Sequence, residues 1–545
     1  MRSSPHPALV FVVIFVAIFL LHVPLLQLPY FWDEAGYYVP AARDLLLNGS
    51  LIPHTTVSNA HPPLVLAWVA LWWKCAGFAP LVTRSAMLMF AAFSLLGLFR
   101  LAERVANTEV AIASTLCTAL YPVFFAQSSL AQVDLAAAGL TFWGLRAYLE
   151  ERPVAAAVWF SLAALGKETA ILAPVALAGW ELVKLFASKR FALEAAQSAG
   201  SHVGTAAVGC PVERSSTASL RRFVSLLLPI LPLALWFAYH YSRTGYVFGN
   251  PEFFRYNVAS TLNPLRFLLA LALRIWQVFG YMHLWLLTVA MLLAMLLPPV
   301  KDGGVERSRI AVPVQLIFLV VVSAYVGAMA LIGGAVLARY MLPAVPLGII
   351  VAVSTLRRRL RYWLAAIAMV GCVFIVAWFW NPPYGFSPED NLAYRDYVVL
   401  HQDGERFLEA RYPMAHVLTA WPANDELTRP WLGYVTRPVQ VVRIEDFSLD
   451  EVMSAADFRS HFDVALVFST KYEPARPMLE RWKPWEKMKS RFFGFHRDLP
   501  PAAAAQLLGG RVVFSEERNG QWIAVIEMEK DELQNARLDV LSPIP

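Results

Sequence analysis

Residues 8–38 read ALVFVVIFVAIFLLHVPLLQLPYFWDEAGYY, an unbroken apolar run that leads directly into two acids among aromatic rings. Roughly 20 apolar residues are enough for a helix to cross a bilayer, and residues 8–28 form such a segment. Asp33 and Glu34 are therefore expected at the membrane surface. Acids there can simply mark the water boundary beside an aromatic belt, but charges held at a membrane are costly and often serve a function.

The composition assigns the protein class. Hydrophobic residues make up 58% of the 545 residues and charged residues 16%, with a mean hydropathy of +0.50. A chain this apolar must use lipid as its solvent over most of its length, which predicts a polytopic α-helical membrane protein. No small-residue cleavage site follows the first apolar run, so we expect that span to be retained. The four cysteines are far apart and predict neither a disulfide framework nor a thiolate metal site.

Apolar runs separated by polar breaks predict eleven spans, at residues 8–29, 84–103, 109–127, 135–149, 154–166, 168–184, 223–242, 281–299, 310–332, 336–355 and 363–380. Two more segments resemble amphipathic helices lying in the interface. Residues 64–78 are rich in Trp and contain Lys74, and residues 265–280 carry Arg266 and Arg274. The expected total is about 11–13 spans.

Most Lys and Arg residues between the predicted spans fall on one side, with Arg357, Arg358 and Arg359 as the densest group. An excess of positive charge marks the cytoplasmic side, so we expect a cytoplasmic (inner) membrane protein with a cytoplasmic N-terminus. An odd number of spans then leaves the C-terminus extracytoplasmic. The loop at residues 30–83 falls on the same outer side.

The composition changes abruptly at residue 381. From there to the end the chain has 25 acids and 19 bases, whereas residues 1–380 have 15 acids and 27 bases. We therefore predict a transmembrane domain at 1–380, with a catalytic first extracytoplasmic loop at 30–83, and a soluble extracytoplasmic α/β domain at 381–545. Asn519-Gly520 lies between two short apolar runs and predicts a hairpin within a mixed sheet.

The candidate site residues are polar side chains that the predicted spans would bring to one membrane face: Asp33, Glu34, His61, Asp134, Lys167, Arg339 and Tyr340. Each also has a structural interpretation. Asp134 could favour the start of a helix, Arg339 could reach toward lipid headgroups, and Lys167 could form an ion pair with Glu168 at a tight turn.

The order of these residues resembles the C-type membrane glycosyltransferases, in particular the protein O-mannosyltransferases and the bacterial lipid A aminoarabinose transferases (glycosyltransferase family 39). The shared features are an Asp-Glu pair after the first span, His-Pro-Pro-Leu at 61–64, an isolated Asp134 after the third span, Gly-Lys at 166–167, and Arg-Tyr-x-Leu-Pro at 339–343. The resemblance covers most of residues 8–380 and is strongest at 30–64. Bacterial relatives often carry Lys where this chain has His61.

The resemblance implies a sugar donor linked through phosphate to a polyprenol, inversion at the anomeric carbon, and Asp33 as the acid nearest the reaction. Such a donor suits the outer face, where nucleotide sugars are absent. A carboxylate can accept the proton of an attacking hydroxyl, and Arg339 offers planar donors for phosphate, with Tyr340, His61 and Lys167 as further donors. The acceptor is a lipid, glycan or protein, and no nucleic-acid partner is expected.

Two questions stay open at the level of sequence. The spacing of Glu34 and Asp134 is not diagnostic for a divalent cation, so no cofactor is assigned. A transporter or flippase for a lipid-linked or anionic substrate could use the same charges along a translocation path. Transporters usually show repeated halves and charges near the bilayer midplane, and neither is evident here.

The charge distribution yields a topology prediction. A reporter fused after Pro545 should register as extracytoplasmic, whereas a reporter inserted near Arg358 should register as cytoplasmic. Paired alkaline phosphatase and fluorescent-protein fusions measure both positions. If both reporters score in the same compartment, the arrangement of the last predicted span is wrong.

Overall fold

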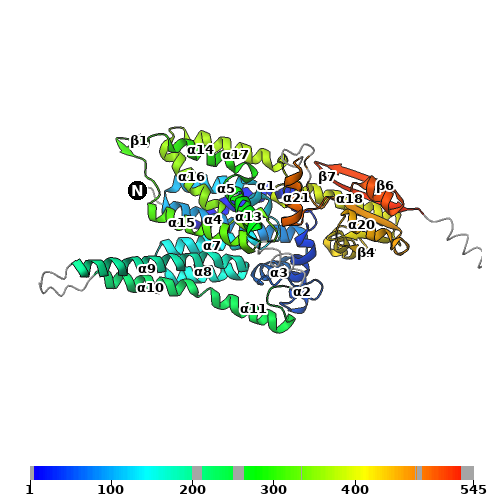
Figure 1. The fold of residues 1–545 in the computed structure, drawn as a ribbon, viewed down its shortest axis with the longest axis horizontal. Coiled ribbons are helices and arrows are strands. Elements are labelled where there is room, and N and C mark those ends of the chain that lie inside the picture. The colour runs from blue at the N-terminus through cyan, green and yellow to red at the C-terminus, as the bar shows by residue number, and fades with distance from the viewer. Residues whose placement is uncertain are drawn as a thin grey trace, which may run out of the picture. The chain divides into compact units, whose positions relative to one another are not determined.

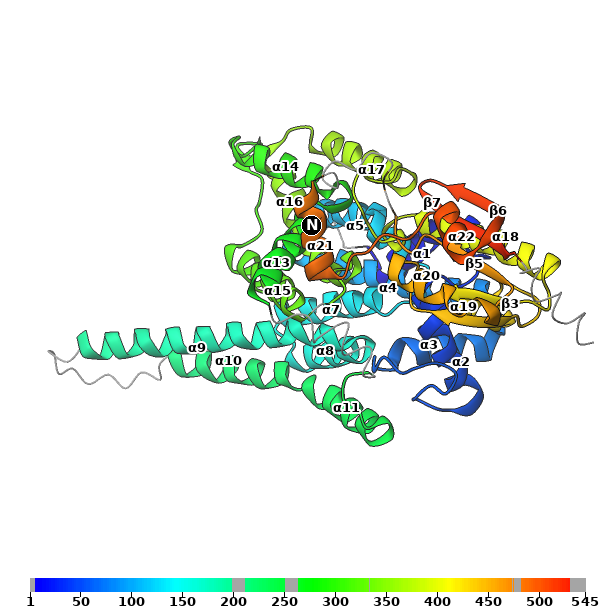
Figure 2. The same ribbon diagram turned by 45° about the vertical axis from the view of Figure 1, so that its right-hand side comes forward.

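The computed structural model describes residues 5–198, 211–249, 263–332, 334–472, 474 and 482–529. The described residues form two compact units. The first, the helical unit, contains the residues up to 27 and residues 37–380; the second, the sheet unit, contains residues 28–36 and those from 381 onward. Figures 1 and 2 show the ribbon in two views.

The helical unit consists almost entirely of α-helices. They are α1 (Pro7–His22), α2 (Val39–Asn48), α3 (Leu64–Ala76), α4 (Pro80–Val105), α5 (Thr108–Leu120), α6 (Pro122–Gln127), α7 (Asp134–Leu149), α8 (Pro153–Gly166), α9 (Leu172–Ser198), α10 (Pro211–Leu227), α11 (Ile230–Thr244), α13 (Pro264–Phe279), α14 (Leu284–Met295), α15 (Val312–Ile332), α16 (Val345–Arg359) and α17 (Trp363–Phe379). Among the described residues of this unit, four 3-10 turns lie between the α-helices: η1 (Val23–Leu25), η3 (Glu168–Ile171), η5 (Tyr281–His283) and η6 (Ala338–Met341). A short hairpin pairs β1 (Lys301–Asp302) with β2 (Val305–Glu306).

Within the described residues, six helical segments are long and apolar enough to cross a membrane: Pro7–Leu25, Pro80–Val105, Glu168–Ala187, Ser219–Thr244, Pro264–Met295 and Val312–Ile332. Four shorter apolar helices, α3, α5, α8 and α17, accompany them. The predicted multi-pass helical class is confirmed.

Local sequence explains where many helices begin. Pro stands in the first turn of α1, α4, α6, α8 and α13, where its missing N–H has no intrahelical partner to lose. Asn side chains cap two helices: Asn107 accepts from the N–H of Val110 at 3.0 Å, and Asn263 accepts from that of Leu265 at 3.0 Å. The packing then places α7 against α4 and α8, and α9 against α10 (Figure 1).

Residues 265–280, which the sequence suggested as an interfacial helix, form most of α13 and belong to an apolar segment that is long enough to cross a membrane. Helix α13 packs against α15 and α16, and its Arg266 and Arg274 are buried at 1% and 0% exposure. Their guanidinium groups donate to backbone carbonyls. Partners within the protein therefore satisfy these two charges, whereas the sequence pattern suggested contacts with lipid headgroups. Helix α14 follows within the same apolar segment after two residues with positive φ, Met282 and His283.

The sheet unit has a five-stranded sheet in the order β4-β3-β5-β7-β6. Its elements are α18 (Ala393–Arg411), β3 (His416–Ala420), α19 (Ala423–Thr428), β4 (Gln440–Ile444), α20 (Leu449–Ala456), β5 (Val464–Phe468), α21 (Lys483–Phe493), α22 (Pro501–Leu508), β6 (Gly510–Arg518) and β7 (Gln521–Met528). Strands β4, β3 and β5 are parallel, whereas β7 runs antiparallel to β5 and β6. The predicted mixed α/β sheet is therefore confirmed.

The predicted hairpin is also confirmed. Asn519 and Gly520 join β6 to β7 with φ angles of 48° and 81°. Positive φ at both central positions is the geometry that favours Asn-Gly in a two-residue turn. Helices α18 and α22 both pack against β6 and β7 of this hairpin and so support the antiparallel half of the sheet (Figure 2).

Candidate functional site

The helical unit brings three of the predicted site residues together around one carboxylate. Asp134 is the first residue of α7, Lys167 directly follows α8, and Arg339 lies in η6. The ammonium group of Lys167 donates to Oδ1 of Asp134, and Nε of Arg339 lies 3.2 Å from Oδ2. The three side chains are only 3–5% exposed. Asp134 is thus more than a helix cap, and Arg339 points into the protein.

Tyr340 adds an aromatic face to this cluster. Nζ of Lys167 lies 3.9 Å from the centre of the Tyr340 ring, and the guanidinium carbons of Arg274 and Arg339 each lie 5.6 Å from it. A ring face attracts nearby cations. We call Asp134, Lys167, Arg274, Arg339 and Tyr340 the cationic cluster. It places three cationic side chains around the Tyr340 ring, two of which also face the carboxylate of Asp134.

Arg274 is the member that the sequence interpretation missed. Its Nη1 donates to the carbonyl of Leu337 at 2.7 Å and its Nη2 to that of Ala335 at 3.2 Å. Gln277, one turn further along α13, donates to the carbonyl of Val336 at 2.9 Å. These bonds hold the segment just before η6. Two arginines and a glutamine in a long apolar stretch were the available signal, since polar groups within membrane segments usually face the protein interior.

Lys167 and Glu168 do not form the expected ion pair with each other. The ammonium group of Lys167 turns to Asp134, whereas Oε2 of Glu168 lies 2.8 Å from Nδ1 of His61. Adjacent residues at the start of η3 point in different directions, so each finds its own partner. His61 also stacks on Tyr38, with ring centres 6.0 Å apart. The predicted site residue His61 therefore contacts Glu168, which follows Lys167 of the cationic cluster in the chain.

The acidic pair belongs to the sheet unit, and its two members are in different environments. Glu34 is fully buried; its Oε2 accepts from the N–H of Phe31 at 2.9 Å, and its own N–H donates to the carbonyl of Phe31 at 2.8 Å. Asp33 is only partly buried. The residue before it, Trp32, has φ of +45°, a conformation that L-residues rarely adopt and that is often found at functional sites. Glu34 thus shapes the turn that carries Asp33.

Aromatic side chains hold this turn within the sheet unit. The ring of Tyr397 on α18 lies 5.1 Å from Phe31 and 5.5 Å from Trp32, both edge-on. Trp421 contacts Trp32 at 5.1 Å and covers Gly36 so closely that an added Cβ there would lie 2.5 Å from the indole nitrogen. We call Phe31, Trp32, Tyr397 and Trp421 the aromatic layer. It fixes the backbone on either side of Asp33.

The arrangement also bears on metal binding. Both carboxylate oxygens of Asp134 already face cations, and Glu34 bonds to its own turn, so neither acid favours a divalent cation. Among the described residues, the group with metal-ligand spacing is instead His401, Glu405 and Glu426 in the sheet unit. None of these three was singled out from the sequence.

Comparison with known proteins establishes the fold. No family model and no curated protein sequence matches the chain. ArnT from Cupriavidus metallidurans bound to undecaprenyl phosphate is similar in structure, with a TM-score of 0.53, 13% identity, and coverage of 96% of this chain and 98% of ArnT. The apo state of the same protein gives a TM-score of 0.53 at 13% identity, and the match covers 95% of this chain and 98% of ArnT. An oligosaccharyltransferase from Archaeoglobus fulgidus with Zn and sulfate scores 0.44 at 13% identity, covering 95% of this chain and 73% of that protein. The chain has the C-type fold that the resemblance implied.

The cationic cluster gives a stability prediction. Asp134→Asn leaves two buried cations, Lys167 and Arg339, without their carboxylate, and breaking such a pair costs about 3–5 kcal/mol. We expect a clearly lower apparent melting temperature for the purified protein. Combining Asp134→Asn with Lys167→Met removes one stranded cation, so the double variant should lose about 0.5–3 kcal/mol less than the sum of the single losses.

Asp44 provides the matched control for this cycle. It is also a buried acid of the helical unit, but it accepts from the N–H groups of His54 and Thr55 at 2.7 and 2.8 Å. Asp44→Asn combined with Lys167→Met should therefore show additive losses. Additive losses in both cycles would contradict the coupling of Asp134 to Lys167.

Proposed function

We propose that the protein is a glycosyltransferase that moves a sugar from a polyprenyl-phosphate carrier to an acceptor hydroxyl, with inversion, on the extracytoplasmic side of the membrane. The observation that carries this proposal is the cationic cluster: two cationic side chains at the carboxylate of Asp134 and a third, Arg274, beside the same Tyr340 ring. The similarity in fold to ArnT, whose structure was determined with undecaprenyl phosphate, supports the choice of a lipid-linked phosphate.

The chemistry of the cluster suits a phosphate that acts as a leaving group. Such a phosphate gains negative charge as the glycosidic bond breaks, and fixed cations at that point stabilise the transition state. Arg339 supplies a planar fork of donors and Lys167 a compact ammonium. Asp134 orients both cations, since it contacts each of them. A phosphate would place its negative charge beside these cations.

An apolar cavity along α8 suits the lipid tail. It has a volume of about 730 Å³ between α8 and α10 and is lined on the α8 side by Pro153, Val154, Ala157, Val158, Ser161 and Leu162. Because an α-helix rises 1.5 Å per residue, Leu162 lies about 8 Å from Lys167 along the axis of α8. We assign this cavity to the polyprenyl chain of the donor, with its phosphate at the cationic cluster.

Asp33 is assigned the role of general base. It is the less buried acid of the pair, and its carboxylate is positioned by the turn that Glu34 and the aromatic layer shape. A base must accept the proton of the attacking acceptor hydroxyl as the new bond to the anomeric carbon forms. Glu34, fully buried and bonded to the N–H of Phe31, is assigned a positioning role instead.

The proposal predicts the effect of removing the base. Asp33→Asn should lower the rate of transfer by about 10² to 10⁴, while abundance and membrane insertion stay near those of the parent. Transfer is measured with purified protein as the amount of acceptor glycosylated over time. Asp463→Asn is the control, because Asp463 is an exposed acid of the same unit. Activity of Asp33→Asn within a few-fold of the parent would remove Asp33 from the reaction.

Phosphate recognition predicts a separate effect at Arg339. Arg339→Lys keeps the charge but loses the planar donor geometry, so the KM for the lipid-linked donor should rise about tenfold or more. The measurement is donor saturation at equal protein level. Arg266→Lys is the matched control, since Arg266 is also a buried arginine of the helical unit but bonds to the carbonyl of Gly334. Unchanged donor dependence in Arg339→Lys would remove Arg339 from the phosphate site.

A further inference from the structure

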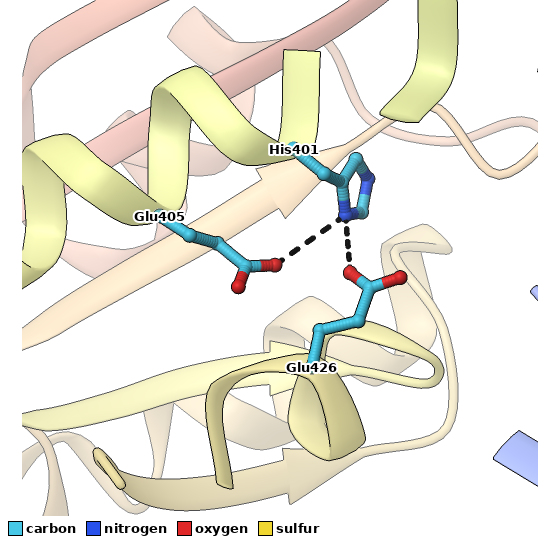
Figure 3. Close-up of side chains that lie close together, drawn as sticks. All are labelled: His401, Glu405 and Glu426. Carbon is cyan, nitrogen blue, oxygen red and sulfur yellow. Dashed lines mark hydrogen bonds and ion pairs between the residues drawn. The ribbon is translucent and has the colours of Figure 1, made fainter. Parts of the chain in front are cut away.

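A second cluster of titratable side chains lies inside the sheet unit and has no part in the chemistry described above. His401 and Glu405 lie one turn apart on α18, and Glu426 projects from α19 (Figure 3). Nδ1 of His401 is 2.6 Å from Oε2 of Glu426 and 3.6 Å from Oε1 of Glu405. The three side chains are 0–1% exposed. A histidine and two acids thus share a fully buried position.

This cluster is incompletely satisfied by the protein around it. Within the described part of the chain, neither oxygen of Glu405 accepts a hydrogen bond from a donor group, and Oε1 of Glu426 and Nε2 of His401 also have no hydrogen-bond partner. Two carboxylates buried against one imidazole carry a large desolvation cost unless a cation neutralises them.

The donor set and its spacing suit a divalent transition metal. Imidazole nitrogen and carboxylate oxygen are both ligands of Zn²⁺, with bonds of about 2.0–2.1 Å. Two tetrahedral ligands of one Zn²⁺ therefore lie about 3.3 Å apart. The separation of 3.6 Å between His401 and Glu405 is close to this value, and that of 2.6 Å to Glu426 needs to open by less than 1 Å. All three ligand atoms lie within 4.8 Å of one another.

We propose that His401, Glu405 and Glu426 bind a divalent metal ion, Zn²⁺ in the first instance, and that this ion ties α18 to α19. Coordination uses Nδ1 of His401 and one oxygen from each carboxylate, and Nδ1 must give up its proton to bind. An ion of charge +2 then balances the two carboxylates. Both helices gain a cross-link that the sheet alone does not provide.

The metal site would also stabilise the turn that carries Asp33. The ring of His401 stacks on Tyr397 with centres 3.9 Å apart, and Tyr397 contacts Phe31 and Trp32. Trp421, two residues before α19 and five before Glu426, contacts Trp32. Helix α18 and the residues just before α19 therefore supply the two rings that contact Trp32, namely Tyr397 and Trp421. Only this consequence for Asp33 rests on the proposed function; metal binding itself does not.

Metal content of the full-length protein tests the site. The protein is purified in detergent through an affinity tag without histidines, and bound metals are measured by inductively coupled plasma mass spectrometry. We expect about one Zn²⁺ per chain, and less than about a tenth of that in His401→Gln and in Glu405→Gln. His416→Gln is the control, because His416 is an exposed histidine beside Asp463 in the same unit, and it should retain the metal.

A second measurement keeps the proposal testable if those variants fail to fold. Stripping the parent protein with a chelator should lower its apparent melting temperature, and added Zn²⁺, but not Mg²⁺, should restore it. Asp33→Asn should still contain metal, which separates failure of the proposed function from failure of this site. The proposal is overturned if the parent contains no metal and takes up none from added Zn²⁺. Full metal content in folded His401→Gln and Glu405→Gln also overturns it.

Discussion

The carboxylate of Asp134 is the interaction on which the helical unit's site depends. It is buried among apolar helices, yet it faces the ammonium group of Lys167 on one oxygen and the guanidinium of Arg339 on the other. These residues come from α7, the end of α8 and η6, so one carboxylate connects three parts of the chain. Removing the carboxylate or one of its cations leaves the remaining charge without that partner in an apolar interior that solvates it poorly. The cationic cluster therefore both links these parts of the chain and concentrates positive charge at one place.

The two units illustrate different ways of holding a polar residue in place. In the helical unit, side-chain donors from α13 bind the backbone carbonyls before η6 and so hold Arg339 and Tyr340. In the sheet unit, aromatic rings hold the turn around Asp33. A base needs a fixed position with access to its acceptor, which ring packing beside a partly buried acid provides. A phosphate needs convergent donors, which a bonded network provides.

Much of the fold could be predicted because its signals are local. Long apolar runs located the helices, and Asn519-Gly520 located the hairpin, since both depend on a few consecutive residues. The convergence of Asp134, Lys167 and Arg339 followed from the resemblance in residue order. The partners of Arg274 could not be predicted, because they lie more than 60 residues away in the chain. The same reason explains why the sequence did not indicate a group of His401, Glu405 and Glu426. Helices α18 and α19 come together only in the folded sheet unit.

The most direct test of the account is to follow the chemical fate of the lipid donor. Purified protein is mixed with a polyprenyl-phosphate-sugar lipid extract and membrane acceptors, and both lipids and acceptors are analysed by mass spectrometry. The account predicts that the lipid-linked sugar is consumed, that free polyprenyl phosphate appears in equal amount, and that an acceptor gains the mass of the sugar. A lipid that crosses the bilayer with its sugar still attached would contradict the account and indicate a flippase.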